Sequence, residues 1–168
     1  GFSIEALHRL LDDGLLTKEK DDDDFRYSML PSIREYGRTL LSSEETRILF
    51  EQLTQYFASL YNETKDSWSD EIAEELRKEM NSLVLCAEQG RAEDSLYCVQ
   101  AIIDITKEQG PYSFGVEMIE KFLARTDISL IESIRVRQKG FVLYTDLDRF
   151  TTMSKIRLLE EGHRGASL

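Results

Sequence analysis

The residues of this chain that could do chemistry are few and far apart. Its 168 residues include two histidines, His8 and His163, and two cysteines, Cys86 and Cys98. A zinc site needs about four ligands, and no Cys or His partner stands at ligand spacing from either histidine. Neither cysteine belongs to a C-x-x-C pair, and both lie in apolar helical patterns, which is typical of packed free thiols in a reducing cytoplasm. The sequence therefore predicts no metal site and a cytoplasmic protein.

Carboxylate and hydroxyl groups are more numerous, but their spacing does not predict catalysis. The run Asp21 to Asp24 could attract calcium, yet it lacks the glycine turn and the closing glutamate of a calcium loop, so we expect a solvated acidic turn. The pairs Glu74-Glu75 and Glu160-Glu161 are expected on exposed helix faces. Ser42-Ser43 is better placed to cap a helix than to act as a nucleophile, because no histidine is positioned to activate it. We predict no catalytic residue and no cofactor.

An aromatic stripe is the first candidate for binding. It consists of Phe50, Tyr56, Phe57, Tyr61 and Trp68. Aromatic side chains at helical spacing most often fill a core, which is the favoured interpretation. The alternative is a peptide-binding groove on the concave face of a helical superhelix, in which Tyr56, Tyr61 and Trp68 would contact the partner.

A basic cluster is the second candidate for binding. Arg135, Arg137 and Lys139 recur at every second position just before Gly140. They could pair with an acidic protein partner, or with the acidic segment 42–90 of the same chain. The sequence leaves both possibilities open.

The N-terminal residues predict a helix followed by a β-hairpin. Apolar residues recur at helical spacing in Ser3–Asp13. Leu15–Glu19 and Phe25–Met29 are then expected as two strands, because the second alternates aromatic and polar side chains. The acidic turn Lys20–Asp24 would join them.

Two capping signatures predict where the next helices begin. Pro31 ends the strand ladder because proline has no N–H to donate. Ser32 and Glu35 have the S-x-x-E spacing of a capping box, so a helix is expected to start directly after the hairpin. Ser42 and Glu45 repeat that spacing and open a long amphipathic helix.

The rest of the chain predicts a series of helices separated by glycines. The expected helices are Ser42 to about Leu60, Trp68 to Gln89, Ala92–Gln109, Phe114–Ala124, Leu130–Lys139 and about Leu147 to Glu161. Gly90, Gly110, Gly140 and Gly162 separate the later ones. This order predicts an α-α superhelix of antiparallel helix pairs, each needing a neighbour to bury its apolar face. The pairs match the tetratricopeptide (TPR) pattern, with its period of about 34 residues, only in degenerate form.

Charge and hydropathy narrow the possible partners. The net charge is −11, and the acidic excess is greatest in residues 42–90. A nucleic-acid surface needs concentrated Lys and Arg, so nucleic acid is a poor candidate partner. No run approaches the roughly 18 apolar residues of a membrane span, so no membrane partner is predicted. Gly1 in place of an initiating methionine indicates a piece of a longer protein.

Three stretches of the chain carry a family resemblance. Leu7–Leu16 is similar to a motif L-x-x-L-x-D-x-S-L-L, and Phe25–Tyr36 to R-Y-x-M/L-H/L-x-x-I-R-E-Y-A. Glu79–Leu83 is similar to the opening of E-x-D/N-N-L-x-x-A-L. The chain thereby resembles the signal-transduction ATPases of the STAND class, in particular bacterial transcriptional regulators of the AfsR and LuxR-related kind. In that family a winged-helix module follows the nucleotide-binding domain and precedes a TPR-like superhelix.

The resemblance implies a domain organisation and a function. Residues 1–41 would be a partial winged-helix module with the hairpin as its wing, and residues 42–168 a TPR-like repeat domain, both truncated. The phosphate-binding loop G-x-x-x-x-G-K-[ST] is absent from the sequence, and Leu30 stands where many members carry a histidine that could bond a phosphate. We therefore expect a non-enzymatic regulatory fragment that binds protein partners or its own nucleotide-binding domain, in signal transduction and transcription regulation.

Two other function classes remain as alternatives. A DNA-binding winged helix would bind duplex in a salt-sensitive way, but its wing would place Asp21 to Asp24 beside phosphates. A scaffold wing is therefore favoured over a DNA-contacting one. An enzyme could assemble its site from dispersed residues, and would then show a convergent polar pocket. The sequence leaves the partner's identity and the oligomeric state open.

Overall fold

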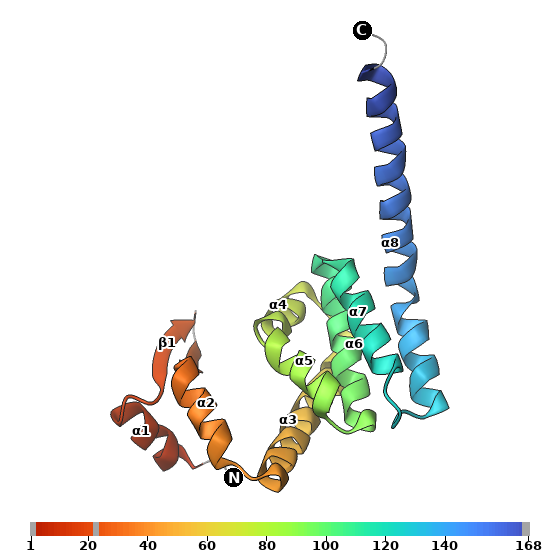
Figure 1. Cartoon of the computed structure of the whole chain (residues 1–168). Helices are drawn as coiled ribbons and strands as arrows, with labels where there is room; N and C mark the ends of the chain where they lie inside the picture. Colours follow the sequence, from red (N-terminus) through yellow and green to blue (C-terminus); the bar gives the residue numbers. More distant parts are fainter. Residues whose placement is uncertain (1–2, 22–23, 166–168) are drawn as a thin grey trace. The chain divides into compact units, whose positions relative to one another are not determined.

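The computed structural model of this chain describes residues 3–21 and 24–165, with side chains for residues 3–20 and 25–148. These residues form eight α-helices, one short 3-10 helix and one two-stranded antiparallel sheet near the N-terminus (Figure 1). The prediction of a mainly helical chain with a small N-terminal hairpin is confirmed. Within this part of the chain, no helix has an apolar stretch that could cross a lipid bilayer.

The chain divides into two compact units. The N-terminal unit is Gly1–Arg47 and the helical unit is Ile48–Leu168, so the division lies inside α3 (Ser43–Thr64). The predicted domain boundary lies between residues 41 and 42, just before that helix.

The N-terminal unit begins with α1 (Ile4–Asp12). Its first turn is capped by Ser3, whose Oγ accepts a hydrogen bond from the backbone N–H of Ala6 at 3.1 Å. Gly14 follows with φ of 68°, a left-handed conformation that glycine adopts at little cost. The helix predicted at Ser3–Asp13 is confirmed.

The hairpin consists of β1 (Thr17–Asp21) and β2 (Asp24–Ser28), paired antiparallel so that Thr17 faces Ser28. The first strand therefore starts later than predicted. The N–H groups of Leu15 and Leu16 both bond to the carbonyl of Leu10, so these two residues close the turn that follows α1 and do not pair in the sheet. The tip of the predicted acidic turn, residues 22–23, lies outside the described residues.

The second helix, α2, spans Pro31–Leu40 and corrects the capping prediction made for Ser32 and Glu35. Both residues lie inside the helix, and the N-cap is Leu30, which has no side-chain cap. The reason is Pro31, whose fixed φ suits the first helical position and whose missing N–H would be unpaired there in any case. The helix thus begins earlier than the capping signature indicates.

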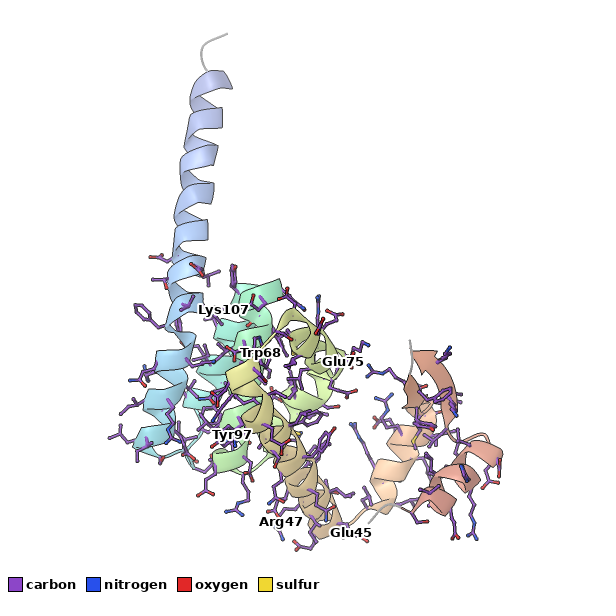
Figure 2. The ribbon with its side chains drawn as sticks, turned by 180° about the vertical axis from the view of Figure 1, so that it is seen from behind. Glu45, Arg47, Trp68, Glu75, Tyr97 and Lys107 are labelled. Atoms are coloured by element: carbon purple, nitrogen blue, oxygen red, sulfur yellow. The ribbon has the colours of Figure 1, made fainter. Side chains whose placement is uncertain are left out.

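The next capping signature is confirmed at the start of α3. The Oγ of Ser42 accepts from the backbone N–H of Glu45 at 3.2 Å, and the Glu45 carboxylate accepts from the backbone N–H of Ser42 at 2.9 Å. Figure 2 labels Glu45 and Arg47 in this first turn.

The helical unit continues after α3 with a short 3-10 helix and five α-helices. They are η1 (Lys65–Ser67), α4 (Asp70–Lys78), α5 (Met80–Gln89), α6 (Ala92–Gln109), α7 (Tyr112–Leu123) and α8 (Leu130–Gly165). From α5 onward each helix contacts the next one, and α4 with α6, α5 with α7 and α6 with α8 also contact each other. Figure 1 shows α6 lying among these neighbours, and residues 101–106 of α6 are all buried. The predicted bounds of α6 are confirmed.

The single helix predicted from Trp68 to Gln89 is wrong, because the chain forms two helices there. The break falls at Glu79, with φ of −98° and ψ of 14°, which ends α4 and begins α5. No glycine or proline marks this position. The bend allows both α4 and α5 to pack against α6, a tertiary demand that local periodicity does not reveal.

The two helices predicted around Gly140 are also wrong, because α8 runs through this residue without interruption. Gly140 is buried, and a Cβ added there would overlap the side chain of Ile119 in α7. The glycine therefore permits close packing of α8 on α7 rather than ending a helix. Gly162 and His163, expected at a helix end and in a terminal loop, also have helical backbone in α8.

Candidate functional site

Asp104 is a buried charged group that joins three helices of the helical unit. It lies in α6 within the buried run 101–106 and is 8% exposed. Its Oδ2 accepts a hydrogen bond from the hydroxyl of Tyr61 at 2.7 Å. The same oxygen forms an ion pair with Nζ of Lys139 at 2.8 Å. A buried carboxylate is costly unless paired in this way, so the cluster links α3, α6 and α8.

This cluster brings together two residues predicted as partner contacts, Tyr61 and Lys139. Tyr61 is 1% exposed, and burial together with its bond to the Asp104 carboxylate raises its pKa well above the usual range of a phenol. The hydroxyl therefore stays protonated near neutral pH and donates its hydrogen bond to Asp104. Lys139 pairs inside its own chain, but with a residue of α6 rather than with segment 42–90.

Tyr61 also belongs to an aromatic group. Its ring centroid lies 5.8 Å from that of Trp68, in an edge-to-face arrangement, and 6.5 Å from that of Tyr97. Trp68 and Tyr97 are labelled in Figure 2. Trp68 is half-buried between η1 and α4, and its Nε1 is buried with no hydrogen-bond partner among the described residues. The core interpretation of the aromatic stripe therefore applies to Tyr61.

Tyr56, the third aromatic candidate, lies elsewhere. It is in α3 and 60% exposed, with its ring edge-to-face on Phe57 at 5.2 Å. Phe57 in turn is 3% exposed and part of the core. The structure thus separates Tyr56, on the surface, from Tyr61, inside.

The basic cluster is likewise divided by helix geometry. Arg135, Arg137 and Lys139 all lie in α8, where Arg137 points away from the other two and Lys139 lies one turn after Arg135, about 40° closer to the buried side. Arg135 and Arg137 are exposed, whereas Lys139 turns inward to Asp104. The two arginines stand at the edges of an exposed apolar strip, which we call the outer face of α8. Its residues are Leu130, Ile131, Ile134, Phe141 and Val142.

The two cysteines lie side by side in the core. Cys86 of α5 and Cys98 of α6 are both fully buried free thiols, as predicted. The hydrogen bond from the Cys98 thiol lowers the pKa of Cys86, and the same bond, with burial, raises the pKa of Cys98. Because neither sulfur reaches solvent, reaction with an external electrophile would require the helices to separate.

The remaining candidates for chemistry whose side chains the structure describes lie on the surface. His8 is exposed on α1, and the side chain of His163 lies outside the described part of the chain, as do those of Asp21 to Asp24. Glu74 and Glu75 are exposed on α4, as expected. Among the described residues, no group of His, Cys, Asp or Glu side chains is arranged to hold a metal ion.

Arg125 is an important residue that the sequence analysis missed. Its guanidinium donates to the backbone carbonyls of Ala87 at 2.8 Å and Gly90 at 2.7 Å, and it also pairs with Asp127. It thereby satisfies carbonyl groups at the end of α5. The sequence does contain a signal for Asp104, because it is a charged residue within an otherwise apolar helical run. No local pattern indicates which groups Arg125 would bind.

The comparisons with known proteins found no match. No protein-family model matches the chain, no curated protein is significantly similar in sequence, and no solved structure matches its fold significantly. The function is therefore argued from the residues and the geometry described above.

Proposed function

We propose that this chain is a non-enzymatic, regulatory protein-interaction fragment of a STAND-class ATPase regulator. Residues 1–41 are the end of its winged-helix module, and residues 42–168 are degenerate TPR-like helix pairs. The fragment binds protein partners or the nucleotide-binding domain of its own protein, with the β1–β2 hairpin acting as a docking wing.

The observation that carries this proposal is the exposure of the apolar side chains in the N-terminal unit. It has regular secondary structure, yet none of its described side chains is buried. Its exposed apolar residues come from both helices and from the hairpin: Ile4, Phe25, Tyr27, Leu30, Tyr36, Leu40 and Leu41. A two-stranded hairpin is marginal by itself in water, and so small a unit needs further surface to pack on. Docking to another domain would supply that surface.

The helical unit supports the second half of the proposal. Contacts between alternate helices, α4 with α6, α5 with α7 and α6 with α8, are what stacked helix pairs of a repeat array make. The hydrogen bond from Tyr61 to Asp104 and the ion pair of Lys139 with Asp104 link these helices to one another. This use of polar groups is that of a scaffold.

The family assignment is tested by the sequence encoded before Gly1. We expect a nucleotide-binding domain with the G-x-x-x-x-G-K-[ST] loop there. A coding sequence without such a domain would overturn the STAND assignment.

The interaction is tested by measuring binding of that purified domain to the immobilised chain. We expect saturable binding that Tyr27→Asp, in the hairpin, weakens by about tenfold or more, since a charge would replace an exposed aromatic contact. Tyr56→Asp, the matched substitution in α3, should leave it unchanged. Loss through Tyr56→Asp alone would move the docking site to the helical unit, and no binding at all would overturn the proposal.

A further inference from the structure

Helix α8 is apolar on two opposite sides. One side packs on α6 and α7 and contains Val136 and Leu143, both fully buried. The other side is the outer face of α8, where Leu130 is 76% exposed and Phe141 66%. At 100° per residue, the five residues of this face fall within about a third of the helix circumference.

The polar residues Gln138 and Thr145 also lie within this arc, but an exposed strip with five large apolar side chains is still typical of an interaction surface. A helix that packs on one side of a protein needs only one apolar stripe, and its solvent side is normally polar. Here the solvent side carries the large side chains of Ile131, Ile134 and Phe141 instead. Burying them would release the solvent that they order, which favours association.

The charges along the edges of the outer face identify a suitable occupant. Arg135 and Arg137 lie toward the N-terminal part of the strip, and Asp146 and Asp148 toward its C-terminal end. Arg135 and Asp146 are about three whole turns apart, so they border the same edge; Arg137 and Asp148 likewise border the other edge. Each edge therefore runs from positive to negative along the helix.

We propose that the outer face of α8 binds the same face of a second copy of this chain, with the two helices antiparallel. A twofold axis near Phe141 and Val142 then places Arg135 of each copy opposite Asp146 of the other. In a parallel arrangement arginine would face arginine and aspartate would face aspartate, which is repulsive. The charge pattern thus favours a second copy of this chain as the partner and an antiparallel arrangement of the two α8 helices.

The inference concerns a different surface from the hairpin and does not depend on the docking proposed above. A single helix pair buries less area than a standard stable interface, so we expect a dimer with a dissociation constant on the order of micromolar. Its exposed ion pairs should make it weaker at high salt.

The first test is sedimentation of the whole chain over a wide range of concentrations, with circular dichroism to check that each variant is folded. We expect a monomer–dimer equilibrium that Phe141→Asp shifts to monomer by at least about tenfold. Leu49→Asp, the matched change at an exposed leucine of α3, should leave the equilibrium unchanged. A wild-type chain that stays monomeric, or a dimer insensitive to Phe141→Asp, would overturn the proposal.

The second test checks the antiparallel direction by charge reversal. Arg135→Glu and Asp146→Arg should each weaken the dimer by a few-fold, because each places like charges opposite one another. The double variant should restore wild-type dimerisation. A double variant that does not recover wild-type dimerisation would exclude this pairing. The binding of the nucleotide-binding domain is measured separately and tests only the proposed function.

Discussion

Asp104 shows how one charged side chain can connect three helices at the scale of single residues. Its carboxylate sits in the most buried segment of α6 and accepts from Tyr61 of α3 and Lys139 of α8 through the same oxygen. The two partners differ in environment, because Tyr61 is 1% exposed whereas the Lys139 side chain is 36% exposed. Losing the aspartate would therefore affect the tyrosine more than the lysine.

We expect a definite order of stability losses in this cluster. Tyr61→Phe should lower the free energy of unfolding by about 1.5–3 kcal/mol, the usual cost of losing a hydrogen bond to a charged group. Asp104→Ala should cost more, because it leaves the buried Tyr61 hydroxyl unpaired, and Lys139→Met should cost least. Urea denaturation followed by circular dichroism measures all three. An Asp104→Ala loss smaller than that of Lys139→Met would show that the cluster is not a structural link.

The raised pKa of Tyr61 also makes the free energy of unfolding depend on alkaline pH. Burial and the Asp104 carboxylate raise the pKa of Tyr61 in the folded state above the ordinary phenol value of about 10. The unfolded chain therefore loses this proton first, and the contribution to stability is complete below pH 10 and declines as the pH rises above it. Tyr144 acts in the same direction, because burial and Glu120 raise its pKa to about 12.

Denaturation midpoints measured at several pH values above 10 check this expectation. The stability difference between the wild type and Tyr61→Phe should shrink as pH rises, since the two proteins differ only in this phenol group. A difference that is constant with pH would contradict the assigned shift.

At the scale of elements, helix ends decide where the chain can turn. Three S-x-x-E signatures occur, and the structure uses two of them. Ser42 with Glu45 caps α3, and Ser129 with Glu132 caps α8 in the same reciprocal way. The Ser32 signature is unused because Pro31 starts α2 first. The hydrogen bonds of Ser42 also lower the pKa of Glu45 below its usual range.

A matched pair of serine substitutions tests this difference. Ser42→Ala should cost about 1 kcal/mol of local helix stability, because it exposes the first turn of α3 to fraying. Ser32→Ala should cost little, since that side chain caps nothing. Hydrogen exchange of the Glu45 and Thr46 amides measures the fraying, and equal effects of the two substitutions would contradict the assigned caps.

At the scale of the whole molecule, the two units differ in how they are held together. The helical unit contains a continuous core that includes Leu83, Val99, Ile102 and Ile119. The N-terminal unit has no buried side chain among its described residues. Local opening should therefore require much less free energy in the N-terminal unit than in the helical unit.

Limited proteolysis with trypsin checks this difference. We expect cleavage after Lys18, Arg34 and Arg38 well before cleavage after Lys107 or Lys121, although all five side chains are exposed. Adding the nucleotide-binding domain should slow the early cuts if it docks on the hairpin. Simultaneous cleavage of both units would show that they open together.

Much of this fold can be predicted from local sequence signals. Helical periodicity indicated α1 and the bounds of α6, alternation and an acidic turn indicated the hairpin, and a capping box indicated the start of α3. These signals succeed because the groups that produce them lie within a turn or two of one another. The TPR-like arrangement and the STAND assignment stay predictions.

Tertiary structure alone decided the rest. In the sequence, a glycine that ends a helix cannot be told from a glycine that allows two helices to pack closely. Only the packing shows that Gly140 has the second role, because Ile119 of α7 lies against α8 at this residue. The break at Glu79 exists because two helices must both reach α6. Asp104 and Tyr61 form a hydrogen bond although they are 43 positions apart in the sequence. Composition and periodicity give no information about contacts over such a separation. The sequence by itself thus determined where most helices and the hairpin form, because those preferences are local. The fold decided where α4 ends, why α8 continues through Gly140 and which side chains meet.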